Sequence, residues 1–227
     1  MQHLRTHALL DLTHTLAAPL LEPEGFPWEA LPRLQAFIRE LGSRLPQAEF
    51  EQIAPEVWVA RDAVVAPSAA LNGPCIIDHE TEVRHCAFIR GSALVGKNAV
   101  VGNSTELKNV LLFDRVQVPH YNYVGDSILG YRAHMGAGAI TSNVKSDKQA
   151  VVLRVGDKRI ETGMRKLGAI LGDCVEIGCN SVLNPGTIIG RESIVYPTSS
   201  VRGFIPERHI YKSEQNIVAM RMNEGGR

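Results

Sequence analysis

The sequence predicts an all-β solenoid, in which short strands are wound into a stack of coils. Aliphatic residues return every six positions over much of the chain, and a small residue stands four positions after most of them. Aromatic residues make up only 6% of the 227 residues, while there are 20 glycines and 12 prolines. Few large side chains and many turn residues favour a repetitive architecture.

The repeat is clearest from Val59 onward. Nine successive hexads begin there, and each starts with Val, Leu or Ile. A second run of five hexads begins at Leu171 and follows the same rules, and a short stretch from Leu129 follows them in a shifted frame. Small residues occupy the fifth position of the first eight hexads, namely Ala63, Ala69, Cys75, Thr81, Ala87, Ala93, Ala99 and Thr105.

A period of six fits neither an ordinary amphipathic strand, which alternates with period two, nor a helix with period 3.6. It fits a coil in which each hexad makes one short strand and one turn. We expect the aliphatic residue to point inward and stack on its equivalents in neighbouring coils. Three hexads per coil would then form a triangular prism.

The repeat divides the chain into three parts. Residues 55–205 form the predicted solenoid, residues 206–227 a C-terminal tail, and residues 1–54 a small helical cap. Within the cap, apolar residues at three- and four-residue steps predict a helix from Pro27, ending near Gly42 and Pro46, and a shorter helical segment is expected over 8–21. We expect the cap to cover the first open coil and its strand edge; docking of a partner is the alternative.

Two segments interrupt the repeat, Pro119–Asp126 and Val144–Lys166. In the second, residues 150–155 and 159–162 flank Gly156-Asp157, which predicts a projecting hairpin. A solenoid accepts insertions only on its outside, so interruptions of the repeat are where functional residues are expected.

Composition restricts the function classes. Lys and Arg total 24, as do Asp and Glu, so the formal net charge is zero and gives no support to a nucleic-acid partner. No apolar run approaches the roughly 20 residues of a membrane span, and the N-terminus lacks a signal-type apolar core. These features predict a cytoplasmic protein. The four cysteines show no Cys-x-x-Cys spacing, so no metal site is expected.

Polar side chains that can bind an anion or move a proton lie near the interruptions. A histidine beside an anion site suits a general base, because its unperturbed pKa lies close to neutrality. Arg and Lys gathered near a loop favour a bound phosphate. The set comprises Arg90, Lys108, His120, Tyr123, Asn143, Lys148 and Lys166.

Four segments carry a resemblance to a known family. They are 102–108 (GNSTELK), 119–126 (PHYNYVGD), 136–143 (GAGAITSN) and 162–173 (TGMRKLGAILGD). Over roughly residues 55–205 the chain resembles the acetyltransferase domain of the bifunctional enzymes that make UDP-N-acetylglucosamine, and it is more similar still to the archaeal sugar-1-phosphate nucleotidylyltransferase/acetyltransferases. This resemblance to hexapeptide-repeat acyltransferases implies a left-handed parallel β-helix and an N-acetyltransferase acting on an amino-sugar 1-phosphate.

The resemblance also assigns roles to matching positions on the acceptor side. His120 matches the general base that takes a proton from the sugar amine. Asn143 matches a residue beside the amine and the acetyl group. The matches to sugar and phosphate contacts are Arg90, Lys108, Tyr123 and Lys166, and Lys148 resembles a loop lysine of the archaeal enzymes.

On the donor side, Ala137, Cys179 and Pro197 match positions that line the groove for acetyl-coenzyme A. The resemblance implies no metal for acetyl transfer and a homotrimer with the active site between subunits. The chain has no Gly-rich nucleotide loop ending in Thr-Arg. We therefore expect uridylyl transfer to come from a separate nucleotidylyltransferase.

Some alternatives stay open at the level of sequence. His134 and Val144 depart from the bacterial pattern, which leaves glucosamine 1-phosphate and galactosamine 1-phosphate as acceptors. A nucleotide-linked amino sugar is a further candidate acceptor. A non-catalytic subunit that binds a sugar phosphate is the alternative from another class.

Overall fold

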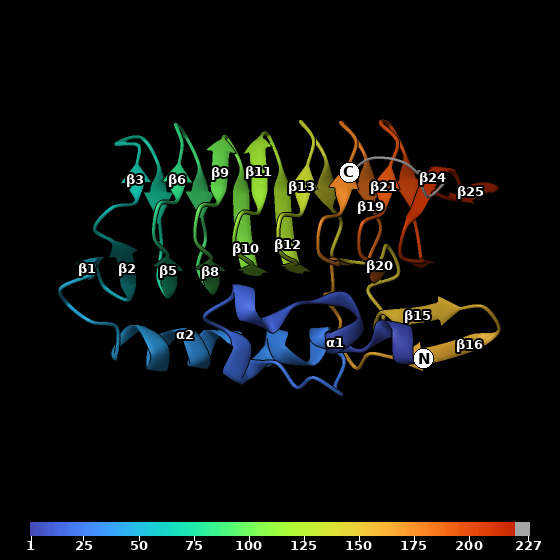
Figure 1. Cartoon of the computed structure of the whole chain (residues 1–227), viewed down its shortest axis with the longest axis horizontal. Helices are drawn as coiled ribbons and strands as arrows, with labels where there is room; N and C mark the ends of the chain where they lie inside the picture. Colours follow the sequence, from blue (N-terminus) through green and yellow to red (C-terminus); the bar gives the residue numbers. More distant parts are fainter. Residues whose placement is uncertain (221–227) are drawn as a thin grey trace, which may run out of the picture.

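Each hexad forms one short strand and one turn, and the coils stack into a parallel β-solenoid with three faces (Figure 1). The computed structural model describes residues 1–220. Residue Cys75 pairs with Ala93, and Glu82 pairs with Val100, so neighbouring coils are three hexads apart. The predicted solenoid and its triangular section are therefore confirmed.

The strands of the three faces are as follows. Face 1 contains β2 (Val57–Ala60), β5 (Cys75–Ile77), β8 (Ala93–Val95), the second halves of β10 (Glu106–Leu112) and β12 (Tyr123–Leu129), β17 (Ala169–Leu171), β20 (Thr187–Ile189) and β23 (Phe204–Ile205). Face 2 contains β3 (Val64–Val65), β6 (Glu82–Val83), β9 (Val100–Asn103), β11 (Gln117–His120), β13 (His134–Met135), β18 (Glu176–Ile177), β21 (Ile194–Val195) and β24 (His209–Ser213). Face 3 contains β4 (Ala70–Leu71), β7 (Phe88–Ile89), the first halves of β10 and β12, β14 (Ile140–Thr141), β19 (Val182–Leu183) and β22 (Ser200–Val201).

The core consists of the residues that the repeat placed at the first and fifth positions. Ile77 and Val95 are fully buried at first positions, and Ala93 and Thr105 are buried at the small position. Leu112 continues the column of Ile77 and Val95, although it is the sixth residue of its hexad, because the corner residues Ser104 and Asn109 are only five positions apart. The fourth position turns the corner and often has a left-handed backbone, as at Ser92 (φ 52°) and Asn98 (φ 54°). The small residue that follows leaves room for this turn.

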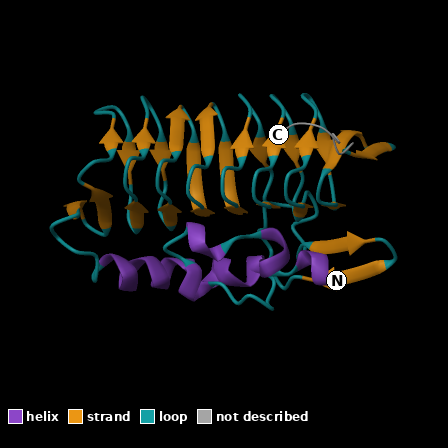
Figure 2. Ribbon diagram, in the orientation of Figure 1, coloured by secondary structure: helices purple, strands orange, loops and turns teal. Residues whose placement is uncertain are grey.

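The helices of the N-terminal segment lie along the side of the solenoid (Figure 2), and of residues 1–54 it is β1 (Phe50–Ala54) that covers the strand edge of the first coil, where the whole cap was expected. Helix α2 (Leu34–Gly42) contacts β5, β8 and β10, and the 3-10 helix η4 (Pro27–Arg33) contacts β12. At the far end His3 stacks on Phe204, with ring centroids 4.7 Å apart. The remaining elements of this segment are η1 (Gln2–Leu4), α1 (Thr6–Leu9), η2 (Leu12–His14) and η3 (Ala18–Leu20).

The reason for this placement is an apolar ladder on the outside of face 1. On face 1 each coil contributes one outward-facing apolar residue, which pairs in register with the equivalent residue of the next coil. Apart from the first and last of these residues, Trp58 and Phe204, all are exposed by 1% or less. The N-terminal segment covers this ladder with Leu31, Leu34 and Ile38, which are themselves buried. The ladder consists of Trp58, Ile76, Leu94, Leu111, Ile128, Ile170, Ile188 and Phe204.

Antiparallel strands close both ends of the stack. Strand β1 (Phe50–Ala54) pairs with β2, and β25 (Asn216–Ala219) pairs with β24. Strand β24 is itself a parallel neighbour of β21, so the last coil continues past the boundary expected at residue 205. Within residues 1–220, no helix has the length and apolar character needed to cross a membrane.

The two interruptions of the repeat differ in structure. Val144–Lys166 leaves the solenoid and contains a hairpin of β15 (Val152–Val155) and β16 (Lys158–Glu161), as the sequence predicts. Pro119–Asp126 forms no loop and continues from β11 into β12. The left-handed corner residues Tyr121 and Asp126 are five positions apart there, so one hexad is a residue short.

Replacing Ile76 by Ala tests the covered ladder. Ile76 is fully buried between face 1 and the N-terminal segment, so the substitution removes apolar contacts on both sides. We expect the free energy of unfolding to fall by about 2–5 kcal/mol, measured by urea denaturation. The matched control is Val64→Ala on face 2, where the side chain is 64% exposed and the loss should stay under about 0.5 kcal/mol. Equal losses in the two variants would contradict the ladder.

Candidate functional site

The corner between faces 3 and 1 is built differently from the other corners. Strands β10 and β12 run through it without a loop and bend at Asn109 (φ 54°) and Asp126 (φ 48°). Asn and Asp adopt this left-handed backbone more readily than most other residues. The two bends are stacked, and each puts a polar side chain at the corner.

The long insertion starts and ends at the same corner. Asn143 follows β14, and its carbonyl accepts a hydrogen bond from the backbone N–H of Leu167 at 3.0 Å. The backbone N–H of Gly168 donates to the carbonyl of Asp126 at 2.8 Å. Residues from three successive coils therefore meet here, although they lie up to about 60 positions apart in the sequence.

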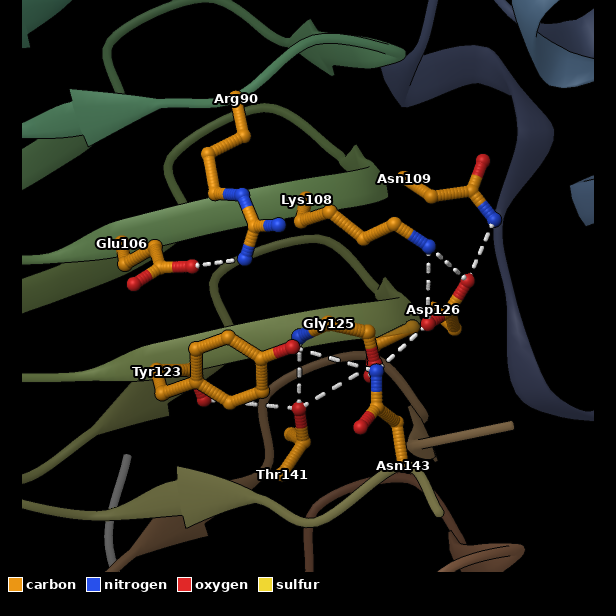
Figure 3. Close-up of polar contacts among 10 residues, drawn as sticks. Arg90, Glu106, Lys108, Asn109, Tyr123, Gly125, Asp126, Thr141 and Asn143 are labelled. Carbon is orange, nitrogen blue, oxygen red and sulfur yellow. Dashed lines mark hydrogen bonds and ion pairs between the residues drawn. The ribbon is translucent and has the colours of Figure 1, made fainter. Parts of the chain in front are cut away.

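Asp126 is the centre of this corner (Figure 3). Its carboxylate is buried and accepts hydrogen bonds from Lys108 Nζ at 3.0 Å, Asn109 Nδ2 at 2.8 Å and Asn143 Nδ2 at 2.6 Å. A buried carboxylate needs such partners, because an unpaired one would lose its hydration without compensation. Asp126 thus fixes the positions of Lys108 and Asn143 relative to each other.

Tyr123 extends the network onto face 3. Its hydroxyl oxygen accepts a hydrogen bond from Asn143 Nδ2 at 3.2 Å. Burial raises the pKa of Tyr123, and the nearby carboxylates Asp126 and Glu106 raise it further, against the lowering effect of the Asn143 hydrogen bond. The phenol is therefore neutral at physiological pH and its hydroxyl proton is available to a ligand.

Arg90 lies one coil before Lys108 and forms an ion pair with Glu106, with Nη1 and Oε1 2.6 Å apart. The hydrogen bond to Glu106 raises the pKa of Arg90. The Arg90 side chain is 47% exposed, so it can still meet a ligand at the surface of face 3. Arg90, Lys108 and Tyr123 thus follow one another on successive coils of this face.

The two other lysines of the set differ in position. Lys166 directly precedes Leu167, whose backbone bonds to Asn143, so it lies beside the corner. Lys148 lies in the exposed part of the insertion, where its backbone N–H donates to the carbonyl of Lys145. Among residues 1–220, no hydrogen bond or ion pair joins the Lys148 side chain to the corner.

His120 lies on a second corner, between faces 2 and 3. Its side chain is exposed, and its backbone N–H donates to Asn122 Oδ1 at 3.1 Å. Asn122 is buried and donates in turn to the carbonyls of Gly136 and Ala139. This turn fixes the backbone on both sides of His120. The two residues between His120 and Tyr123 connect the second corner with face 3.

The donor-side positions follow His120 along this second corner, one coil at a time. The backbone N–H of Gly138 donates to the carbonyl of His120, that of Asn180 to Ala137, and that of Thr198 to Cys179. Ala137 is half-buried, while Cys179 and Pro197 are exposed. His120, Ala137, Cys179 and Pro197 therefore form one continuous ridge, which we call the His120 ridge.

Close stacking at the His120 ridge explains a glycine of the 102–108 segment. A Cβ atom at Gly102 would collide with the backbone of Pro119, which directly precedes His120. The sequence analysis did not single out Gly102 or the polar residues Glu106, Asn109, Asn122 and Asp126 as site residues. Four of these five lie inside the segments that carry the family resemblance, and Asn109 directly follows one of them.

The two departures from the bacterial pattern differ in position: His134 lies on another face, and Val144 directly follows Asn143 at the corner. His134 is on face 2, where Nδ1 is 2.7 Å from Oε2 of Glu176. Val144 is 42% exposed and begins the insertion. Within residues 1–220, His, Cys, Asp and Glu do not form a group of three that could hold a metal ion.

Comparison with known proteins gives a family and several relatives. Residues 71–217 match the family model described as the GMPPB C-terminal domain. The chain is 32% identical over 203 residues to the bifunctional protein GlmU of Methanococcus maripaludis, covering 88% of this chain and 49% of that protein. It is 31% identical over 156 residues to the bifunctional sugar-1-phosphate nucleotidylyltransferase/acetyltransferase of Sulfurisphaera tokodaii, covering 60% of this chain and 39% of that protein.

The chain thus spans about half the length, or less, of these curated relatives. Among solved structures, a hexapeptide transferase family protein from Anaplasma phagocytophilum aligns with a TM-score of 0.40 and 14% identity, covering 74% of this chain and 82% of that chain.

Replacing Asp126 by Ala tests the centre of the corner. The substitution leaves Lys108, Asn109 and Asn143 without their shared acceptor. We expect the free energy of unfolding to fall by about 2–4 kcal/mol, measured by urea denaturation. Asp157→Ala, in the exposed turn of the β15–β16 hairpin, is the matched control and should change it by under about 0.5 kcal/mol. An Asp126 variant as stable as this control would show that the network does not hold the corner.

Proposed function

The chain belongs to the family of the GMPPB C-terminal domain and is a hexapeptide-repeat acyltransferase, and we propose that its reaction is acetyl-coenzyme A-dependent N-acetylation of an amino-sugar 1-phosphate. The acceptor is glucosamine 1-phosphate or galactosamine 1-phosphate. The product is the N-acetyl sugar 1-phosphate used for UDP-N-acetylhexosamine synthesis. The observation that carries the proposal is the arrangement of Arg90, Lys108 and Tyr123 on one face, together with an exposed His120 at the corner that borders this face.

The acceptor phosphate interacts with the cations of face 3. Arg90 offers a planar guanidinium and Lys108 a compact ammonium, and both suit phosphate oxygens. Each already has a carboxylate partner, so these cations are held in position before the ligand arrives. Tyr123 donates its hydroxyl proton to a sugar or phosphate oxygen, and Lys166 adds a charge from the side of the insertion.

His120 acts on the amine. An amino group must be neutral to attack a thioester, and the acceptor first loses one proton to solvent. Its nitrogen then attacks the carbonyl carbon while His120 takes the second proton. The carbon–sulfur bond breaks, and His120 delivers that proton to the leaving thiolate. The exposed position of His120 leaves its ring free to meet the amine.

The amide of Asn143 lies next to the acceptor side of the site. Both hydrogens of its Nδ2 are already donated, one to Asp126 and one to the Tyr123 hydroxyl, so its orientation is fixed before reaction. The negative charge that develops on the thioester oxygen is then stabilised by a backbone N–H, or by Asn143 after it releases Tyr123. The groove for acetyl-coenzyme A is assigned to the His120 ridge, where the side chains of Ala137, Cys179 and Pro197 are small and Cys179 and Pro197 are exposed.

The assembly belongs to the proposal as well. The His120 ridge is open to solvent in a single chain, whereas acyl transfer needs a site from which water is excluded. A homotrimer, with each ridge facing a neighbouring subunit, would supply the missing wall. Uridylyl transfer would then come from a separate nucleotidylyltransferase.

Replacing His120 by Ala tests the assigned base. We expect kcat to fall by about 10²–10⁴-fold, because the amine loses its proton acceptor. The measurement follows free thiol release from acetyl-coenzyme A with each amino-sugar 1-phosphate. His85→Ala is the matched control, since His85 is exposed at the equivalent corner two coils earlier. A His120 variant that keeps the wild-type rate refutes the base; a wild-type protein that is silent with every acceptor refutes the reaction.

Replacing Lys108 by Met tests the phosphate contact. Loss of one charge-assisted hydrogen bond should raise KM for the acceptor by about 10–100-fold. KM for acetyl-coenzyme A should stay within about twofold, because the donor groove lies on the other corner. Lys97→Met, at an exposed position away from the site, serves as control. An equal rise in both KM values would assign Lys108 a general structural role instead.

A further inference from the structure

A pocket of about 330 Å³ lies between the β15–β16 hairpin and the last coils of the solenoid. Leu153 and Val151 of the hairpin are buried, and both pack onto the corner at Gly186. The floor consists of the corners Pro185–Gly186 and Arg202–Gly203. The hairpin, which Figure 1 shows beside the stack near β20, is therefore fixed against the coils and forms a wall of the pocket.

The lining of this pocket is strongly cationic. It includes four basic residues and no carboxylate, in a chain whose formal net charge is zero. The basic residues are Lys145, Arg154, Arg159 and Arg202. We call this pocket the hairpin pocket.

Neighbouring carboxylates neutralise only part of this charge. Lys145 pairs with Asp147 at 3.0 Å, and Arg159 pairs with Glu161 at 2.9 Å. Among the residues that the structure describes, 1–220, Arg202 donates to the neutral Asn184, at 3.3 Å, and neither Arg202 nor Arg154 forms an ion pair with a carboxylate. Within this part of the chain two of the four positive charges thus lack a charged partner, which favours an anionic ligand.

The hairpin pocket is connected to the candidate active site. A second hollow of about 300 Å³ shares Lys145, Pro185 and Arg202 with it. That hollow is also lined by Ser142 and Val144, the two neighbours of Asn143. An extended ligand can therefore reach from the Asn143 corner to the hairpin.

We propose that the hairpin pocket binds a diphosphate-bearing ligand, separate from the sugar 1-phosphate assigned to Arg90 and Lys108. Three arginines and one lysine around one pocket suit the several oxygens of such a group. The pocket volume falls in the usual range for small-molecule sites. The ligand's place in the reaction rests on the proposed acetyl transfer; its binding here does not.

Two ligands carry this chemistry, and the experiment distinguishes them. One is coenzyme A, the donor of the proposed reaction, of which the acetyl end is assigned to the His120 ridge and only the diphosphate to the hairpin pocket. The other is the diphosphate of a nucleotide-linked amino sugar, for which UDP is the probe. Binding of each to the full chain is measured by isothermal titration calorimetry at two salt concentrations, without any acceptor. A site built on unpaired cations should bind more weakly at high salt.

The test variant is Arg154→Ala with Arg202→Ala, which removes the two arginines that lack a carboxylate partner. Lys158→Ala, on the same hairpin but outside the pocket lining, is the matched control. We expect the double variant to bind one probe at least tenfold more weakly and the control to bind both as wild type does. Circular dichroism and the urea midpoint check that the double variant is folded, and Arg154→Lys with Arg202→Lys should recover part of the affinity.

Loss of coenzyme A binding assigns the pocket to the donor, and loss of UDP binding assigns it to a nucleotide-linked acceptor. Unchanged binding of both probes, or a wild-type protein that binds neither, overturns the proposal. With UDP as the probe, the His120→Ala variant separates the pocket from the proposed reaction: His120 lies outside the pocket lining and no UDP contact is assigned to the His120 ridge, so UDP binding should be unchanged. If a probe binds in the hairpin pocket but no amino sugar is acetylated, the pocket proposal stands and the proposed acetyl transfer is refuted.

Discussion

Stacking of one buried aliphatic residue per hexad on its equivalent in the next coil sets the geometry of the whole molecule. Ile77, Val95 and Leu112 belong to one such column, and a slip of one position would place polar residues in the core. The chain can therefore vary only at its corners and on its outer surface. Both candidate binding regions are found there.

The corner between faces 3 and 1 shows what such variation achieves. Shortening a hexad by one residue lets β10 and β12 run through the corner, where Asn109 and Asp126 take left-handed backbone conformations. The polar side chains of successive coils then converge on one buried carboxylate. Because Asp126 is buried, its carboxylate is stable only with its hydrogen-bond donors, and Asp126 in turn orients the donors Lys108 and Asn143. The loss of any member of this network therefore disturbs the others.

Much of this structure could be predicted from the sequence, because a period of six admits few folds. The hexads from Val59 predicted the three faces, and Gly156-Asp157 predicted the hairpin. The grouping of Lys108, Tyr123 and Asn143 rested on their places near the interruptions of the repeat and on the resemblance, and the structure brings these three residues into one network. Their chemical roles, and that of His120, stay predictions.

The place of the N-terminal segment and the positions of two side chains could not be predicted from the six-residue repeat. The N-terminal segment lies along face 1 because Ile76, Leu94 and their equivalents form an outward apolar ladder. That signal is present in every third hexad, but it is visible only once the three faces are distinguished. Asp126 was missed because a carboxylate near a turn is ordinarily solvated, and its burial depends on coils that are distant in the sequence. Lys148 lies in the insertion, where no repeat fixes the position of a side chain.

The most direct test of the account is the identity of the reaction product. The full chain is incubated with acetyl-coenzyme A carrying a ¹³C-labelled acetyl group, together with glucosamine 1-phosphate or galactosamine 1-phosphate, and the sugars are analysed by mass spectrometry. The account predicts a labelled N-acetyl sugar 1-phosphate from at least one of the two acceptors. Recovery of both acceptors without label, from a folded protein that binds coenzyme A, would contradict it.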